Sequence, residues 1–169
     1  MMFNRLWEPD MTDWMDRLNR MKMGKFRSLF SELTIPEKNA LDGFYKGFFV
    51  GPSWLRIIAG PLLVITGLGG WWGKRFNGDD TAINLVKTEG QLKPKFPMEL
   101  IDIPSLIDNK PGLTLQYDKR NPFPWPYITD ELRQLDPGIY LGMTYIRIKP
   151  VSRITLPFLL QHQENFNGL

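Results

Sequence analysis

Hydrophobic residues repeat every three or four positions in one early segment, which places them on a single face of a helix: Met11, Trp14, Met15, Leu18 and Met21. Asp10 or Thr12 can cap this helix, because a side-chain oxygen accepts hydrogen bonds from the free N–H groups of the first turn. Basic residues then follow with no acidic residue between them: Arg17, Arg20, Lys22, Lys25 and Arg27. The pattern predicts an amphipathic helix that either packs on the domain with its cationic side in solvent or lies on an anionic membrane.

From Gly43 onward, short runs of aromatic and β-branched residues alternate with turn residues, which is typical of strands. The predicted strands cover 43–50, 71–76, 81–86, 96–103, 113–117, 139–148 and 154–161. Asn77-Gly78 accepts the positive φ of a tight turn. Short helices are expected at 36–41, after Thr34, and at 130–135, between Thr129 and Asp136-Pro-Gly. Many short strands separated by turns predict an antiparallel sheet that curls or closes.

The chain has 169 residues, which is enough for one ordinary domain. We expect an N-terminal arm and helix over 1–33, with Phe3 and Trp7 as aromatic anchors in the arm. A β-barrel domain should follow over 34–162, and a flexible tail over 163–169. The first sixteen residues are already charged and lack the apolar core of a secretory signal. A cytoplasmic location is therefore expected.

The most apolar segment runs from Ile57 to Gly73, without a charge between Arg56 and Lys74. A helix that spans a bilayer needs about 20 apolar residues, so this glycine-rich segment is too short for one. The preferred interpretation is a buried strand and turn with a short apolar helix around Pro61–Leu68. Insertion into a membrane surface or a protein interface is the alternative, with Leu62 and Leu63 as contacts.

Composition removes several classes of chemistry. The chain has no Cys and a single His, so thiolate metal sites, disulfides, Cys nucleophiles and paired-His metal sites are excluded. We expect no cofactor or metal, with haem bound through His162 as the alternative. The formal net charge is only +3, and prolines interrupt the aromatic segment 122–127, so nucleic-acid binding is not expected.

Candidate chemistry is limited to a few polar residues after the middle of the chain. Tyr117-Asp118 ends a predicted strand, and Asp130 and Arg133 share a face of the helix predicted at 130–135. In an apolar cavity, a carboxylate beside an Arg can orient a substrate or act as a base. The structural alternative is an Asp at the helix N-terminus and an Arg paired with a nearby carboxylate.

The order of several short motifs resembles the GXWXG-domain family joined to its C-terminal domain of unknown function. Gly43-Phe-Tyr45-Lys-Gly47 is similar to the GXWXG motif, with Tyr in the Trp position, and Trp72-Gly73-Lys74-Arg75-Phe76 is similar to the segment that follows it. The downstream order also matches: Tyr117-Asp118, Asp130-x-x-Arg133, Asp136 and Leu141-Gly142-Met143. The resemblance covers about residues 35–161. It implies a small, lipocalin-like β-barrel with an internal cavity, and no established reaction.

The leading hypothesis is a mainly β protein, α+β by content, that binds a lipid or fatty-acid-like molecule in its barrel without catalysis. The expected cavity residues are Tyr45, Phe49, Trp72, Phe76, Tyr117, Met143 and Tyr145, with Asp118 and Arg133 as the polar end. The second expected partner is an anionic membrane surface. The protein would lie on the inner face of a membrane and contact it through the basic helix. Two alternatives stay open: a cofactor-free isomerase or hydrolase using Asp118, Asp130 and Arg133, and a structural subunit of a complex. The oligomeric state is not predicted.

Overall fold

The structure is a computed structural model, and it describes residues 11–152, 154–164 and 166. The arm predicted for residues 1–10, with Phe3 and Trp7, lies outside the described residues. So does most of the predicted tail.

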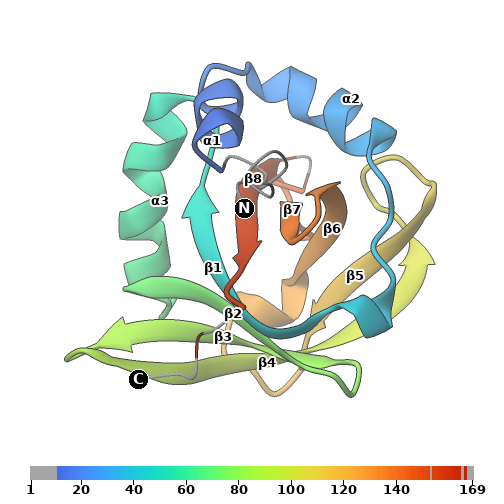
Figure 1. Cartoon of the computed structure of the whole chain (residues 1–169). Helices are drawn as coiled ribbons and strands as arrows, with labels where there is room; N and C mark the ends of the chain where they lie inside the picture. The colour runs from blue at the N-terminus through green and yellow to red at the C-terminus, as the bar shows by residue number, and fades with distance from the viewer. Residues whose placement is uncertain (1–10, 153, 165, 167–169) are drawn as a thin grey trace, which may run out of the picture.

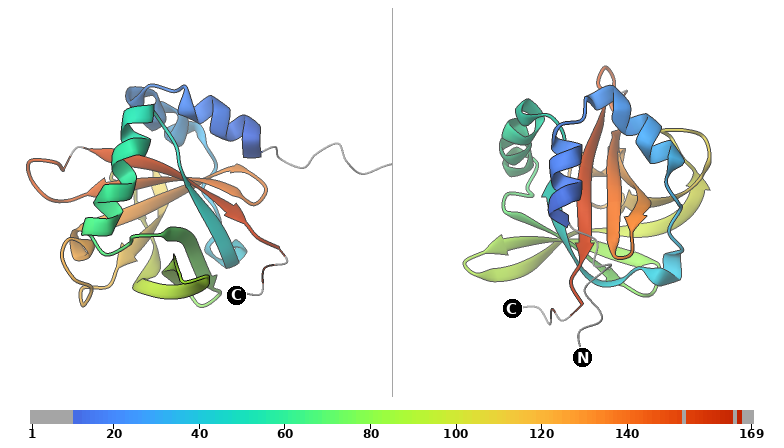
Figure 2. Two further views of the ribbon diagram at one scale, coloured as in Figure 1. Left: turned by 90° about the vertical axis from the view of Figure 1, so that its left-hand side faces the viewer. Right: turned by 45° about the horizontal axis from the view of Figure 1, so that its top comes forward.

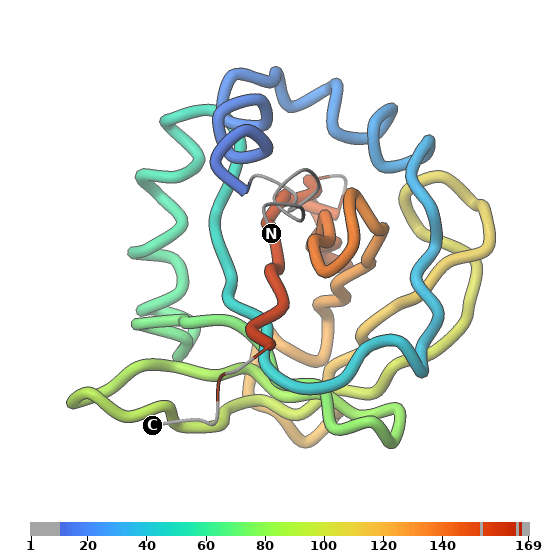
Figure 3. The backbone as a smooth tube through the Cα atoms, viewed as in Figure 1, coloured from blue at the N-terminus to red at the C-terminus, as the bar shows by residue number. Residues whose placement is uncertain are grey.

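In the described part of the chain, eight antiparallel strands close into a barrel (Figure 1). Each strand pairs with the next along the chain, and β1 pairs with β8 to complete the circuit, which can be followed in Figure 3. The strands are β1 (Asp42–Phe49), β2 (Trp71–Asn77), β3 (Thr81–Thr88), β4 (Gln91–Pro104), β5 (Pro111–Tyr117), β6 (Ile128–Asp136), β7 (Ile139–Ile146) and β8 (Thr155–His162). The predicted small, lipocalin-like antiparallel barrel is confirmed.

Within the described residues, three α-helices lie on the outside of this barrel. They are α1 (Met11–Asn19), α2 (Met23–Glu32) and α3 (Ser53–Ile65), with 3-10 turns η1 (Lys38–Ala40) and η2 (Trp125–Tyr127). Figure 1 shows α1 and α2 crossing one side of the barrel and α3 beside β1. The single basic helix that was predicted is thus two helices, and the helix predicted at 61–68 begins earlier and contains Pro61.

Residues 130–135, predicted to be helical, belong to strand β6. The prediction was wrong because β6 is buried on both faces, so its sequence lacks the alternation of a half-exposed strand. Asp130 and Leu132 face the barrel interior, whereas Glu131 and Arg133 face outward and are also buried. The predicted helix at 36–41 is likewise shorter, a 3-10 turn over Lys38–Ala40.

Two apolar clusters lie on opposite faces of the sheet. The first fills the barrel interior and includes Tyr45, Phe76 and Leu132. The second lies outside, where Leu18, Phe26 and Phe30 of α1 and α2 pack on strands β7 and β8. The period-2 alternation of each strand therefore decides whether a side chain meets the interior or the helices.

Candidate functional site

A cavity of about 290 Å³ lies within the barrel and reaches α3. This volume is near the lower end of the range for small-molecule sites. Most of the wall is apolar or aromatic, and its strand residues include Phe49, Trp71, Ile128, Ile146 and Phe158. The polar residues of the wall are Thr66, near α3, and a cluster made of Lys74, Asn84, Tyr117, Asp130 and Thr144. The cavity is thus mainly apolar, with one compact polar cluster in its wall.

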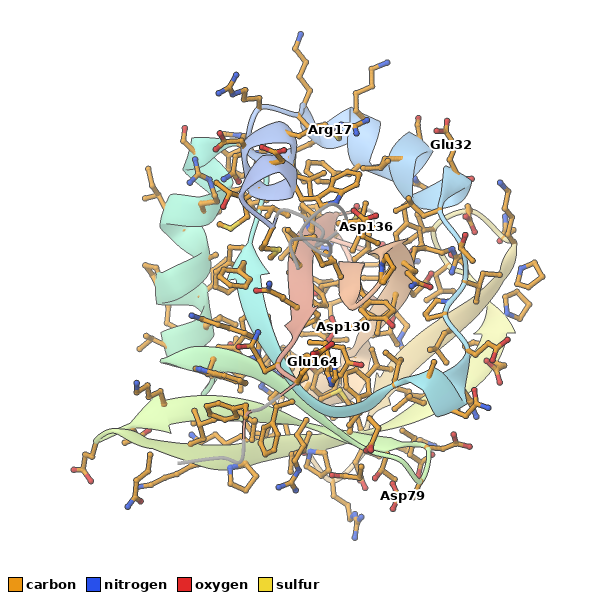
Figure 4. The ribbon with its side chains drawn as sticks, in the orientation of Figure 1. Arg17, Glu32, Asp79, Asp130, Asp136 and Glu164 are labelled. Carbon is orange, nitrogen blue, oxygen red and sulfur yellow. The ribbon has the colours of Figure 1, made fainter. Side chains whose placement is uncertain are left out.

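An ion pair forms the centre of this polar cluster. Lys74 Nζ lies 2.8 Å from Asp130 Oδ2, and both side chains are almost completely buried. Lys74 Nζ also donates to Asn84 Oδ1 at 2.9 Å and lies 3.2 Å from the Tyr117 hydroxyl. Figure 4 shows Asp130 in the middle of the barrel, away from its surface. The two charges therefore compensate each other in a region that excludes most of the solvent.

The remaining members of the cluster hold this ion pair in place. The Tyr117 hydroxyl donates to Asp130 Oδ2 at 3.1 Å, and Thr144 Oγ1 donates to Asp130 Oδ1 at 2.6 Å. Asn84 donates to the Tyr117 hydroxyl at 3.0 Å and accepts from the Trp71 indole at 3.1 Å. Burial and the neighbouring Asp130 charge raise the pKa of Tyr117 well above its ordinary value, so its hydroxyl keeps its proton.

Two glycines make room for the aromatic rings beside the cluster. A Cβ at Gly47 would lie 2.3 Å from the Trp71 ring, and one at Gly142 would lie 2.1 Å from the Phe158 ring. Lys74 Nζ lies 5.9 Å from the Trp71 ring centroid and 5.7 Å from that of Phe158, within cation–π range. Only glycine at these strand positions lets both rings lie close to the backbone and frame the ammonium.

Helix α3 separates the cavity from the outer surface on one side. Its inward face lines the cavity with Leu55, Ala59, Leu62 and Leu63, followed by Thr66 just after the helix. Its outward face is also apolar: Ile65 is 81% exposed, Ile57 72% and Val64 66%. Arg56 is the only charged residue in the helix. The helix is hydrophobic on both sides, which is unusual for an element exposed to water.

Two further segments meet α3 around the cavity. Residues 118–127 contribute Pro124 and Trp125 to the cavity wall, and the β7–β8 connection contributes Ile148. The Trp125 indole donates to the Thr66 carbonyl at 2.7 Å, which ties the first segment to the end of α3. Figure 2 (left panel) shows α3 and both connections toward the same side of the barrel. We call α3, residues 118–127 and the described residues of 147–154 the mouth surface.

The structure places some of the predicted cavity residues in the interior. Phe49 and Tyr117 line the cavity. Tyr45 and Phe76 are buried in the same interior cluster, with ring centroids 5.0 Å apart, but they do not reach the cavity.

Three predicted wall residues face away from the interior. Trp72 points outward and stacks on Phe166, because a bulge between Trp71 and Gly73 gives the inward position to Trp71 instead. Met143 and Tyr145 occupy the outward positions of β7, in the cluster beneath the helices. Their neighbour Thr144 is the inward residue. The strand prediction for this region was sound, and the assignment of its faces was wrong.

The expected polar end made of Asp118 and Arg133 does not form. Asp118 follows β5 at the surface and pairs with Arg120 at 2.6 Å, which lowers the pKa of Asp118 to about 2. Arg133 is buried outside the barrel, 3.5 Å from Asp108 and stacked over the Phe30 ring. Asp130 alone of the three enters the cavity, since neighbouring strand residues point to opposite faces. The catalytic trio considered from the sequence is therefore not assembled.

His162 ends strand β8, and its ring lies 4.8 Å from that of Tyr45. It is half-buried and does not line the cavity, so its position gives the haem alternative no support. Among the described residues, no group of three or more His, Cys, Asp or Glu side chains could hold a metal ion.

The residues expected to contact a membrane lie in two places. Leu62 and Leu63 are on α3, where Leu62 both lines the cavity and is 46% exposed. Lys22 and Lys25 are exposed near the α1–α2 corner, as are Arg17 and Arg20. Arg27 instead donates to the Ile107 carbonyl at 2.6 Å. Gly51, just before α3, donates to Asn19 at 3.3 Å, so the basic corner lies next to the start of α3.

No protein-family model matches the sequence, and no curated protein matches it either. Among solved structures, a crystal structure of a protein from Thermomonospora curvata resembles this chain with a TM-score of 0.69 and 18% sequence identity. The alignment covers 90% of this chain and 95% of the other. At this identity the likeness shows a shared fold and carries no information on function.

Sequence reasoning missed Lys74, Asn84, Trp71 and Thr144 as cavity residues. One signal in the sequence indicates Lys74: it shares a strand face with Phe76, so its side chain is expected to point into the apolar interior. The partner of that lysine could not be identified, because Asp130 was assigned to a helix and Asn84 lies on a different strand.

Proposed function

We propose that this protein binds a lipophilic small molecule, lipid-like or fatty-acid-like, in its barrel cavity without catalysis. The observation that carries the proposal is the cavity itself, an apolar volume of about 290 Å³ that meets one buried polar cluster. Sites of this kind hold a ligand through apolar contacts and orient it through a few polar groups. The likeness to the GXWXG-domain family remains part of this proposal, and its motif residues Tyr117 and Asp130 fall in the cavity.

Native mass spectrometry of the purified protein, followed by lipid extraction, tests this function directly. We expect a co-purified lipophile, and we expect added medium-chain lipophiles to raise the melting temperature. Ala59→Phe should abolish both effects, because Ala59 faces the cavity from α3 and a phenyl ring would fill part of it. Ile57→Phe is the matched control, since the same ring then points away from the cavity. A wild-type protein that carries no lipophile and shows no shift contradicts the proposal.

We also propose that the mouth surface rests on an anionic membrane, from which the ligand enters. Six of the large hydrophobic side chains exposed in the described residues lie on α3, and Phe123 in the adjacent segment is 73% exposed. Basic residues accompany them: Arg56, Lys119, Arg120, Arg147 and Lys149, against Asp118 as the acidic residue of the same segments. Apolar side chains with basic neighbours match the headgroup boundary of an anionic bilayer. No helix among the described residues is long and apolar enough to cross a membrane.

Co-sedimentation with vesicles of phosphatidylcholine, with and without phosphatidylserine, tests this second proposal. We expect binding to the anionic vesicles, weakened by salt, and lost in the double variant Ile57→Ser/Ile65→Ser. Lys22→Gln/Lys25→Gln shows whether the basic α1–α2 corner takes part. Light scattering at several protein concentrations examines self-association. Equal binding by wild type and the serine variant, or a dimer that buries α3, overturns the membrane proposal.

A further inference from the structure

The ion pair at the inner end of the cavity uses all the hydrogen-bonding capacity of its cation. An ammonium group has three hydrogens to donate. Lys74 Nζ has three oxygen partners: Asn84 Oδ1 at 2.9 Å, Asp130 Oδ2 at 2.8 Å and the Tyr117 hydroxyl at 3.2 Å. A ligand that approached Lys74 would have to displace one of these partners.

The cavity wall is also electrically neutral. Lys74 and Asp130 are the charged residues among the described residues that line it. The nearby cation on β6, Arg133, lies on the other face of the sheet and pairs with Asp108. A ligand whose ionised group lies at this polar cluster would therefore be buried without a counterion, which is strongly unfavourable.

The hydrogen-bonding groups of the cluster that remain free to contact a ligand are polar but uncharged. The Asn84 amide donates one of its two N–H groups to Tyr117, which leaves the other for a ligand. Thr144 Oγ1 donates to Asp130, and its lone pairs remain able to accept. Both groups suit a hydroxyl or carbonyl oxygen.

We propose that the cavity selects uncharged lipophiles that carry a single hydroxyl or carbonyl group and discriminates against carboxylates. This inference rests on the proposed ligand-binding function and narrows it from lipophiles in general to neutral alcohols, ketones and esters, which excludes ionised fatty acids. The Lys74–Asp130 pair acts here as a specificity device: Asp130 neutralises the lysine that would otherwise attract an acid.

The experiment compares 1-decanol with decanoate, two ligands with the same chain length. Affinities are measured by displacement of a fluorescent lipophile from the wild-type protein at about pH 8, well above a carboxyl pKa of roughly 4. We expect decanol to bind at least about tenfold more tightly, a difference of roughly 1.4 kcal/mol. The gap should narrow as the pH falls toward the pKa of the free acid, because the protonated acid is uncharged.

Asp130→Asn gives the cavity a net positive charge and should reverse the preference. With Lys74 unpaired, decanoate gains a buried counterion and is expected to bind more tightly than decanol. Asp118→Asn is the matched control, because it removes a carboxylate outside the cavity and should leave the preference as in the wild type. Thermal unfolding establishes that each variant is folded, and the wild-type comparison stands without them.

The outcomes distinguish the ligand selectivity from the underlying lipophile-binding function. Equal or tighter binding of decanoate by the wild type overturns the selectivity and leaves the lipophile-binding function intact. An Asp130→Asn variant that is folded and still prefers decanol overturns the role assigned to the ion pair. If neither probe binds and no lipophile co-purifies, both the function and the selectivity fail.

Discussion

Lys74 and Asp130 form a buried ion pair whose surroundings are mostly apolar. Removing two charges from water is costly, and the mutual attraction of such a pair often does no more than offset that cost. Here the charges also have Asn84, Tyr117 and Thr144 as hydrogen-bond partners. The pair thus stabilises the fold little more than apolar residues at the same positions would. Removing one member, however, leaves the other as an unpaired buried charge.

Single substitutions in the pair should therefore cost more than the double substitution. We expect Lys74→Met to lower the free energy of unfolding by about 3–5 kcal/mol, because it leaves a buried carboxylate without its cation. Lys74→Met/Asp130→Leu should lose less than the sum of the single variants. Urea unfolding of the four proteins measures the coupling. Strict additivity would mean that the two charges do not stabilise each other.

The buried Glu131 carboxylate gives the protein a pH dependence whose sign follows from its burial. Burial raises its pKa above the ordinary 4.5, and hydrogen bonds from Ser105 and the Leu106 amide, with the charge of Arg133, offset part of that effect. The folded protein therefore keeps this proton to higher pH than the unfolded chain. The contribution of Glu131 to the free energy of unfolding falls as the pH rises from about 4.5 through the folded pKa.

Glu131→Gln removes this titration and should change the pH profile in one direction. The free energy of unfolding of the variant, relative to wild type, is expected to rise between about pH 4.5 and neutrality. Urea unfolding at a series of pH values gives this difference. Asp118→Asn is the control, because Arg120 holds the pKa of Asp118 near 2, below that range. A flat or falling difference for Glu131→Gln contradicts the assignment.

At the scale of single elements, the strands are built around close contacts between glycines and aromatic rings. Gly142 on β7 faces Phe158 on β8 across the pair, and Gly47 on β1 lies against the Trp71 ring. Gly24 in α2 differs, because no neighbouring atom lies within 4 Å of the position that a Cβ would take. The same substitution should have opposite effects in these two settings.

We expect Gly142→Ala to lower the free energy of unfolding by about 1–3 kcal/mol, since the new methyl group displaces the Phe158 ring. Gly24→Ala should raise it by about 0.4–1 kcal/mol, because Gly24 lies in a helix and has room for the methyl group. Urea unfolding measures both changes. Ligand affinity should also fall in Gly142→Ala, because the Phe158 ring that the methyl group shifts lines the cavity. A neutral Gly142→Ala would show that the ring position is not fixed by this contact.

The strands and their faces differ in how well they can be predicted from the sequence. Seven of the strands were predicted because turn residues such as Asn77-Gly78 separate them, and turn chemistry is local. Strand β6 was missed because burial of both faces depends on α2 and the β4–β5 connection, which are distant in sequence. The β2 bulge exchanged Trp72 for Trp71 in the cavity wall for a similar reason: a one-residue shift in pairing leaves no mark in composition. Site residues depend on faces, so the site was predicted less well than the fold.

At the scale of the whole molecule, the sheet carries apolar side chains on both sides over β7 and β8. The interior side closes on itself, whereas the outer side needs α1 and α2 as a cover. Leu18, Phe26 and Phe30 of these helices are completely buried against outward residues such as Leu141 and Leu159. The N-terminal helices are therefore part of the folded domain, and their basic residues are the exposed side of a structural element.

A chain that lacks residues 1–33 should consequently lose stability rather than simply lose charge. Deleting residues 1–33 exposes the outer apolar cluster of β7 and β8, and it removes Phe30 from beneath the Arg133 guanidinium. We expect aggregation in size-exclusion chromatography and the loss of a cooperative thermal transition. Lys22→Gln/Lys25→Gln is the matched control: both lysines are exposed, so the melting temperature should stay as in wild type. A truncated chain that unfolds cooperatively at the wild-type temperature would show that the barrel is stable without its helical cover.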